Sequence, residues 1–144
     1  MGVPIWRAII HDWTKFLPAE LPHYDRQFFG DKSDPDGFAR AWLHHQNSNP
    51  HHWEYWITRS DHSIGNADVV DGCVPMPETY VREMIADWLG ASRAYLGTWD
   101  IHEWLERKLA RIKVHPDTRD LIIRVIWTYL DGYDMSWLES VSGK

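Results

Sequence analysis

Cysteine is nearly absent from the sequence, and its scarcity limits the chemistry of the chain. The 144 residues include one cysteine, Cys73, which has no partner for an internal disulfide bond. A single thiol favours a reducing compartment, so we expect a cytoplasmic protein. A domain of this length buries roughly 68% of its unfolded surface and needs no disulfide bond for stability. One domain over residues 1–144 is therefore expected.

Long hydrophobic runs are also missing. A membrane-spanning helix needs about 20 consecutive apolar residues, and no stretch of the sequence approaches that length. Near the N-terminus only residues 8–10 form an apolar run, and Arg7, His11 and Asp12 flank it closely. This pattern predicts neither a membrane anchor nor a signal peptide.

Positive charge is in deficit. The chain has 15 Lys and Arg residues against 21 Asp and Glu residues, for a formal net charge of −6. Proteins that bind nucleic-acid backbones non-specifically depend on Lys and Arg, so no broad nucleic-acid binding is expected. A small phosphorylated ligand stays compatible with this balance, because a bound divalent metal reverses the sign of a local site.

Helical periodicity dominates what the sequence does contain. Ile5, Trp6, Ile9, Ile10 and Trp13 recur at the spacing of one helix face, and Pro18 ends that run. Similar spacing and capping signals predict helices over about 5–17, 19–29, 50–57, 77–95 and 116–130, with a weaker tail at 135–141. A further helix contains residues 38–45, and Asp100 with Glu103 fits a capping box for a helix that runs to about residue 112. Residues 60–76 lack a helical period. We therefore predict an all-α single-domain bundle of six or seven helices with one long irregular loop.

Three details of this prediction depend on single residues. Asp34 or Asp36 is available as the N-cap of the third helix. Asn49 followed by Pro50 is typical of a cap and a first helical position, so a new helix is expected there. The irregular loop at 60–76 joins a histidine-rich segment to the next helix, and we expect it to border a substrate entrance.

The first candidate site is the doublet His11 and Asp12, followed by Lys15. Lys15 lies one helical turn from both members of the doublet, where an ammonium group can meet an anionic ligand oxygen. The alternative is a helix terminus with polar residues on its outer side, in which Lys15 interacts with the last carbonyl groups.

The second candidate site is a histidine cluster. Four of the nine histidines lie between positions 44 and 52: His44, His45, His51 and His52. His45 continues the apolar face of its helix and is expected to point inward, with His44 at the edge of that face. Imidazole is a common ligand of transition metals. The alternative is two His–His dipeptides at the surface.

The third candidate site lies on the helix predicted over 77–95. The apolar stripe of this helix consists of Val81, Met84, Ile85, Trp88 and Leu89. Asp87 stands next to the stripe, where an unpaired carboxylate is costly, so we expect a metal, an arginine or several hydrogen bonds beside it. Glu83 is expected to be a solvated surface residue. Arg93 is a candidate contact for an anionic substrate.

Together these motifs resemble the HD superfamily. The similarity covers residues 11–16, 41–56 and 76–95, and it extends to a small family of HD-like proteins of bacteria and their phages. The resemblance implies an all-α fold, a cytoplasmic location in a bacterial cell or a phage-infected host, and a divalent transition metal (Mn, Fe, Co, Ni or Zn) or Mg. It also implies a set of metal ligands, namely His11, Asp12, His44, His45 and Asp87.

The resemblance departs from the superfamily pattern at one point. The superfamily usually supplies another histidine from a helix upstream of the doublet, and no histidine precedes His11 in this sequence. We expect His51, His52 or His23 to replace that ligand, unless it is provided otherwise.

The function expected from these features is a metal-dependent phosphohydrolase acting on a nucleotide or a related phosphate ester, such as a cyclic nucleotide or a deoxynucleoside triphosphate. Asp12 would orient or deprotonate the attacking water, and Lys15 would offset charge on the phosphate. The alternatives are a non-enzymatic domain that binds a ligand or a protein, and a di-iron oxygenase. A homo-oligomer is compatible with the sequence.

Overall fold

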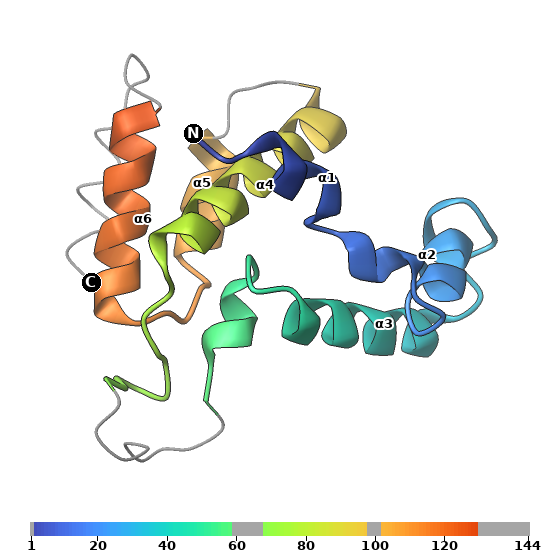
Figure 1. Cartoon of the computed structure of the whole chain (residues 1–144). Helices are drawn as coiled ribbons and strands as arrows, with labels where there is room; N and C mark the ends of the chain where they lie inside the picture. Colours follow the sequence, from blue (N-terminus) through green and yellow to red (C-terminus); the bar gives the residue numbers. More distant parts are fainter. Residues whose placement is uncertain (1, 59–67, 98–101, 130–144) are drawn as a thin grey trace.

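The computed structural model describes residues 2–58, 68–97 and 102–129, and helices dominate these ranges (Figure 1). The all-α prediction is confirmed, because the described residues contain no strand beyond isolated β-bridges. No helix in these ranges has the length and apolar character needed to cross a membrane. The elements in chain order are α1 (Ile5–Ile10), η1 (Trp13–Phe16), α2 (Leu21–Phe28), α3 (Pro35–Ser48), η2 (Trp53–Trp56), α4 (Glu78–Leu96), α5 (His102–Leu109) and α6 (Pro116–Tyr129), where η denotes a 3₁₀-helix.

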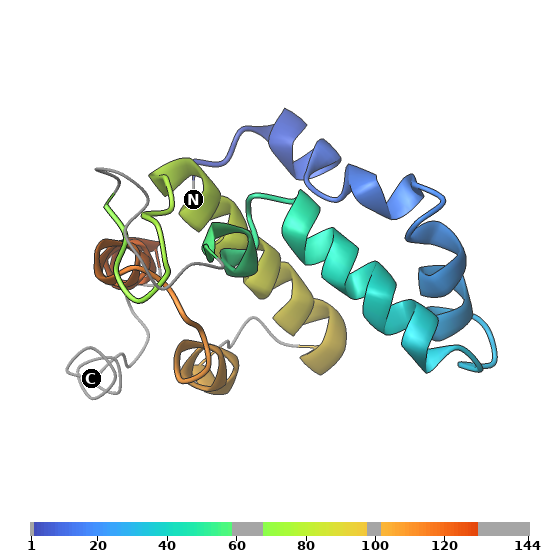
Figure 2. The same cartoon turned by 90° about the horizontal axis from the view of Figure 1, so that it is seen from below.

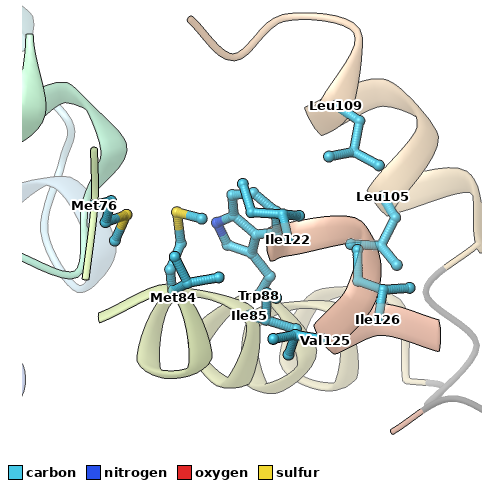
Figure 3. Packing of buried hydrophobic residues seen from close by; sticks show 10 residues of the cluster. Met76, Met84, Ile85, Trp88, Leu105, Leu109, Ile122, Val125 and Ile126 are labelled. Atoms are coloured by element: carbon cyan, nitrogen blue, oxygen red, sulfur yellow. The ribbon is translucent and has the colours of Figure 1, made fainter. Parts of the chain in front are cut away.

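The hydrophobic core lies between the three C-terminal helices (Figure 3). The predicted apolar stripe of α4 faces α6 and α5, and its side chains are almost fully buried. The buried cluster consists of Met76, Val81, Met84, Ile85, Trp88, Leu105, Leu109, Ile122, Val125 and Ile126. Burial of this kind contributes roughly 25 cal/mol for each Å² of apolar surface. The C-terminal helices therefore form the stable base against which the rest of the chain is placed.

The N-terminal elements form a second layer beside α4. Helix α2 packs on α3, and both 3₁₀-helices also contact α3. Figure 2 shows α3 alongside α4, with α1 and α2 on the outer side of α3 and with α5 and α6 beyond α4. This arrangement brings α1, α3, η2 and α4 together, and these are the elements that carry the candidate residues.

The first helix is shorter than predicted. Its continuation to residue 17 is wrong, because α1 ends at Ile10 and a separate 3₁₀-helix begins at Trp13. Between them Asp12 has φ −108° and ψ 22°, outside the helical region. The apolar face expected from periodicity is largely exposed, with Ile5 at 80% and Ile9 at 76%. After the break, the side chains of His11 and Asp12 are mostly buried, with 27% and 21% of each exposed.

Asn49 ends a helix rather than beginning one. It has the extended values φ −116° and ψ 110° and follows the last residue of α3, so the predicted helix start at Asn49 and Pro50 is wrong. Its buried side chain donates to the carbonyl of His45 at 2.8 Å and to Thr14 Oγ1 at 2.7 Å. These tertiary hydrogen bonds hold Asn49 at the end of α3, and only the short η2 follows.

The long loop is described from residue 68 onward. There Val70 and Ile57 each form an isolated β-bridge with Cys73. Asp71 and Gly72 make the connecting turn with φ values of 52° and 75°, as in the tight turns that join antiparallel strands. Three predicted features lie outside the described residues: positions 60–67 of the loop, the capping residue Asp100 and the tail at 135–141.

Two glycines give a matched test of how α3 is capped. Asp34 caps this helix by accepting from Gly37 N at 2.9 Å, as predicted for Asp34 or Asp36. A Cβ at Gly37 would lie 2.0 Å from Asp34 Oδ2, whereas a Cβ at Gly90 meets nothing within 4 Å. We expect Gly37→Ala to displace the cap and lower Tm by about 2–4 °C, and Gly90→Ala to raise it by about 2 °C. Thermal unfolding of both variants checks this, and an unchanged Tm for Gly37→Ala would contradict it.

Candidate metal centre

Asp12 is the central residue of the candidate site. Its Oδ1 lies 3.2 Å from His45 Nε2 and 3.7 Å from His51 Nε2, and its Oδ2 lies 3.3 Å from His11 Nε2. Lys15 Nζ donates to Asp12 Oδ2. One carboxylate therefore contacts side chains from the end of α1, from α3 and from the segment before η2.

Asp87 joins the same site from α4. Its Oδ1 lies 3.7 Å from His11 Nε2, so the distant helix contributes as expected. Two groups of potential metal ligands result, each with all ligand atoms within 4.8 Å of one another: Asp12, His45, His51 and His52 in the first, and His11, Asp12 and Asp87 in the second. Because Asp12 belongs to both, the groups form one continuous site.

The hydrogen bonds of His45 fix the direction of its free electron pair. Its Nδ1 lies 2.9 Å from Glu20 Oε2, and both residues are almost completely buried. An ionised carboxylate only accepts hydrogen bonds, so the ring proton is on Nδ1. The lone pair of Nε2 then points at Asp12 Oδ1. Two acceptors at this distance repel unless a proton or a cation lies between them.

His11 repeats this arrangement on the other side of Asp12. Its Nδ1 donates to the carbonyl of Ala8 at 2.8 Å, which leaves Nε2 facing both Asp12 and Asp87. Without a metal, hydrogen bonds to Asp12 and then to Asp87 raise the pKa of His11 to about 10. The two carboxylates therefore attract positive charge to this position.

His51 and His52 supply buried nitrogen atoms without partners. Nε2 of each ring is inaccessible to solvent and has no hydrogen-bond partner within the described part of the chain. Burial lowers the pKa of His51, and burial together with His51 and His45 lowers the pKa of His52 to about 3. Both rings are thus neutral, which is the form that binds metals. Unsatisfied buried nitrogens beside a carboxylate fit a transition-metal ion.

Negative charge is maintained at the centre despite burial. Burial opposes ionisation of the Asp12 carboxyl, but the contacts from His11, His45 and Lys15 outweigh it and hold its pKa well below the usual range. Burial also opposes ionisation of Asp87, and the contact with His11 lowers its pKa overall. Both carboxylates are therefore charged and available as ligands near neutral pH.

Glu20 is a site residue that the sequence reasoning missed. Its side chain is completely buried and accepts from Thr14 Oγ1 at 3.2 Å, while its two oxygens meet His44 and His45. Glu20 precedes α2 and follows no periodic pattern, so nothing local marks it. A carboxylate behind a metal-binding histidine orients the ring and raises its basicity.

His44 is placed differently from the ligand role implied by the resemblance. Its Nδ1 lies 2.6 Å from Glu20 Oε1, and it belongs to neither of the two ligand groups. The geometry assigns it to support of Glu20, whose other oxygen contacts His45 Nδ1. His23, a suggested replacement ligand, lies 3.0 Å from Asp34 Oδ2 at the start of α3 instead.

Glu83 is buried, so its predicted position at the surface is wrong. Only 6% of the residue is exposed, and its Oε2 accepts from Arg7 Nη2 at 2.7 Å. The Arg7 guanidinium also lies 4.8 Å from the centre of the Tyr80 ring. This ion pair ties α1 to α4 one turn before Asp87 and so fixes the segment that carries His11.

Lys15 contacts the centre, whereas the contact recorded for Arg93 lies at the end of α4. Lys15 contacts Asp12 and lies 5.7 Å from the centre of the Tyr24 ring, so it does not occupy the end of α1 as the alternative interpretation required. Arg93 hydrogen-bonds to the carbonyl of Gly97 at the end of α4 and lines neither cavity described below. A substrate contact from Arg93 stays a prediction without support from this geometry.

Two cavities adjoin the centre. The larger, of about 630 Å³, is lined by Lys15, His52, Asp87 and a group of aromatic side chains that includes Tyr24, Phe28, Trp42, Trp53, Trp88 and Trp104. The smaller, of about 200 Å³, contains His11, His51, Arg7 and Glu83 in its lining. Residues 68–76 line neither, so the described part of the long loop does not support its expected place at the entrance.

Comparisons with known proteins identify a family. The family of unknown function DUF5662 matches residues 1–128, which is most of the chain and includes all the residues of the candidate centre. A search of curated proteins and a search of solved structures found no match. The chain belongs to the DUF5662 family.

Proposed function

We propose that this protein is a metal-dependent phosphohydrolase that acts on a nucleotide or a related phosphate ester. The proposal rests on the imidazole rings that converge on Asp12. His11 and His45 each face it with one ring nitrogen while an acceptor holds the other nitrogen in place. The buried Nε2 atoms of His51 and His52 have no hydrogen-bond partner among the described residues. Such an arrangement is costly without a cation.

The donor set favours some metals over others. Imidazole nitrogens combined with carboxylate oxygens suit Mn, Fe, Co, Ni and Zn. Magnesium prefers an octahedral set of oxygen ligands and keeps several waters, so the number of histidines around Asp12 disfavours it. His45, His51, His52 and Asp12 would hold one ion, and His11 and Asp87 extend the same site.

The catalytic roles follow from position. A bound divalent metal lowers the pKa of a coordinated water and polarises a phosphoryl oxygen. Asp12 lies within 3.7 Å of a nitrogen of His11, His45 and His51, which supports a role in orienting a water or accepting its proton. Lys15 donates to Asp12 from the edge of the larger cavity, so its ammonium group can reach a phosphate oxygen there. Aromatic side chains in the same cavity offer flat surfaces for a nucleobase.

Lys15 gives a specific test of this proposal. We expect Lys15→Ala to keep its metal and its fold but to lose about 100-fold in kcat, because one electrostatic contact to the transition state is removed. Lys15→Arg should recover only part of the rate, since the guanidinium group has a different geometry. The measurements are kcat, metal content and Tm on the same samples.

The exposed Lys113 provides the matched control, because Lys113→Ala removes the same charge away from both cavities. Normal turnover in Lys15→Ala combined with a lower Tm would show that Lys15 has a structural role only.

The proposed activity itself is tested by phosphate release. Purified protein is loaded separately with Mn, Fe, Co, Ni, Zn or Mg and incubated with ribonucleotides, deoxynucleotides and cyclic nucleotides. We expect hydrolysis with at least one transition metal and its loss on chelation. Tight nucleotide binding without hydrolysis under all these conditions would favour a binding protein, and a mixed-valent iron signal with oxygen consumption would favour an oxygenase.

A further inference from the structure

Helix α1 and η1 carry an exposed apolar surface on the side away from their ion pairs. Its six residues are between 48% and 80% exposed: Ile5, Trp6, Ile9, Ile10, Trp13 and Phe16. The four on α1 form neighbouring pairs four positions apart, and Trp13 and Phe16 eclipse each other across three positions of η1. We call this surface the α1 patch. Figure 2 shows α1 at the outer edge of its layer, with no other described helix beyond it.

The α1 patch lies in a stretch of the chain that exposes no charged residue. The exposed residues between positions 2 and 22 are all uncharged. The charged residues of this stretch face partners instead: Arg7 contacts Glu83, Lys15 contacts Asp12, and Glu20 contacts His45. Depletion of charge is typical of the centre of a protein interface. In a chain with 25% charged residues, this separation indicates that the patch is covered by a partner.

The area of the α1 patch is that of a stable interface. Aromatic side chains bury about 150–250 Å² each when they are fully covered, so three aromatic residues and three isoleucines at these exposures present on the order of 800 Å². The largest apolar patch of a typical monomer is about 300–600 Å². A standard protein interface buries about 800 Å² on each partner, which the α1 patch supplies.

The charges around the patch separate its possible occupants. Faces that bind anionic lipids carry Lys and Arg, whereas Arg7 and Lys15 are engaged in ion pairs and the net charge of the chain is −6. A charged protein partner needs opposite charges on this face, and the exposed residues between positions 2 and 22 offer none. A second copy of the chain needs none, because it brings the same uncharged surface.

We propose that the α1 patch is the interface of a homodimer whose two chains are related by a twofold axis. Such an interface uses the same surface on both chains, so an uncharged apolar patch is complementary to itself. Homodimer interfaces are also more apolar than other protein interfaces. Three residues of the patch, Trp6, Ile10 and Trp13, line the smaller cavity together with His11 and His51. Each chain therefore lies beside the candidate centre of its partner, and the dimer does not depend on the proposed activity.

The oligomeric state in solution tests the dimer. The full chain is measured by sedimentation velocity and by size-exclusion chromatography with light scattering. We expect twice the mass of one chain and a dissociation constant of about 1 µM or tighter, as interfaces of this size give. Ile9→Glu should weaken the dimer by at least about 100-fold, because twofold symmetry places the buried charge in the interface twice.

Leu43→Glu is the matched control. Leu43 is an exposed aliphatic residue on α3, outside the α1 patch and both cavities, so the same charge there should leave the dimer intact. Ile5→Glu keeps the test decisive if Ile9→Glu does not fold, since Ile5 is 80% exposed and a carboxylate is favourable in the first turn of a helix. Circular dichroism and Tm show whether each variant is folded.

Three results would overturn the proposal. The first is a wild-type chain that stays monomeric up to about 100 µM, far above the dissociation constants of standard interfaces. The second is a dimer that survives both Ile5→Glu and Ile9→Glu, and the third is equal dissociation of Leu43→Glu. If the wild type is monomeric, co-sedimentation with neutral phospholipid vesicles would assign the patch to a lipid surface, and dimerisation of a chain ending at Tyr129 would assign it to residues 130–144.

Discussion

Asp12→Asn should reduce metal affinity by about 100-fold or more while the chain stays folded. The substitution keeps the shape of the side chain but removes the charge that both ligand groups share. Loss of a residue behind a ligand already costs about 10–100-fold in affinity, so loss of the shared ligand has a larger effect. Metal content by mass spectrometry and titration calorimetry measure it. Alanine at His11, His45 or Asp87 should also lower metal content, to a smaller extent.

Asp25→Asn is the matched control, because Asp25 is exposed on α2 and belongs to neither ligand group. It should bind metal as the wild type does. Full metal occupancy in Asp12→Asn at the same metal concentration would refute the centre as described.

Glu20→Gln should lower metal affinity by about 10–100-fold without contacting the metal. Glu20 accepts from Thr14, His44 and His45 with its two oxygens. A glutamine has one acceptor oxygen and one NH₂ group, so one imidazole must face a donor. If that ring is His45, its proton moves from Nδ1 to Nε2 and occupies the position that the metal needs. The measurement is the dissociation constant of the metal.

The Tm of the metal-free protein separates this positioning role from a general loss of stability. Glu78→Gln, at an exposed residue in the first turn of α4, serves as the control. A large drop in the metal-free Tm with unchanged metal affinity in the folded fraction would mean that Glu20 only stabilises the fold.

The sequence was most informative where burial is periodic. The spacing of Val81, Met84, Ile85 and Trp88 predicted α4 almost to the residue, because that stripe is buried against α5 and α6. The same spacing at Ile5 and Ile9 wrongly predicted a buried face, because the Arg7–Glu83 pair holds α1 and its apolar face stays exposed. Periodicity records which side chains could share a face. It does not record whether another element covers that face.

The residues of the candidate centre also divide into those that a local sequence pattern marks and those that only tertiary contacts reveal. His11, Asp12, His45 and Asp87 were found because each stands beside an apolar stripe, where a polar side chain needs an explanation. Glu20 was missed because it lies in a turn. Its surroundings come from tertiary contacts, such as that with His45 across 25 positions, which no local pattern records.

Helices α1 and α2 differ from the core in what holds them, and the difference has a thermal consequence. Neither α1 nor α2 contains a buried residue, and apart from Ala41 the buried side chains of the region around them are polar, chiefly Thr14, Glu20 and Asn49. Apolar exposure raises the heat capacity on unfolding, whereas polar exposure lowers it. Helices α1 and α2 therefore add less to the heat-capacity change of the protein than the core between α4, α5 and α6 does, and their attachment weakens less on cooling.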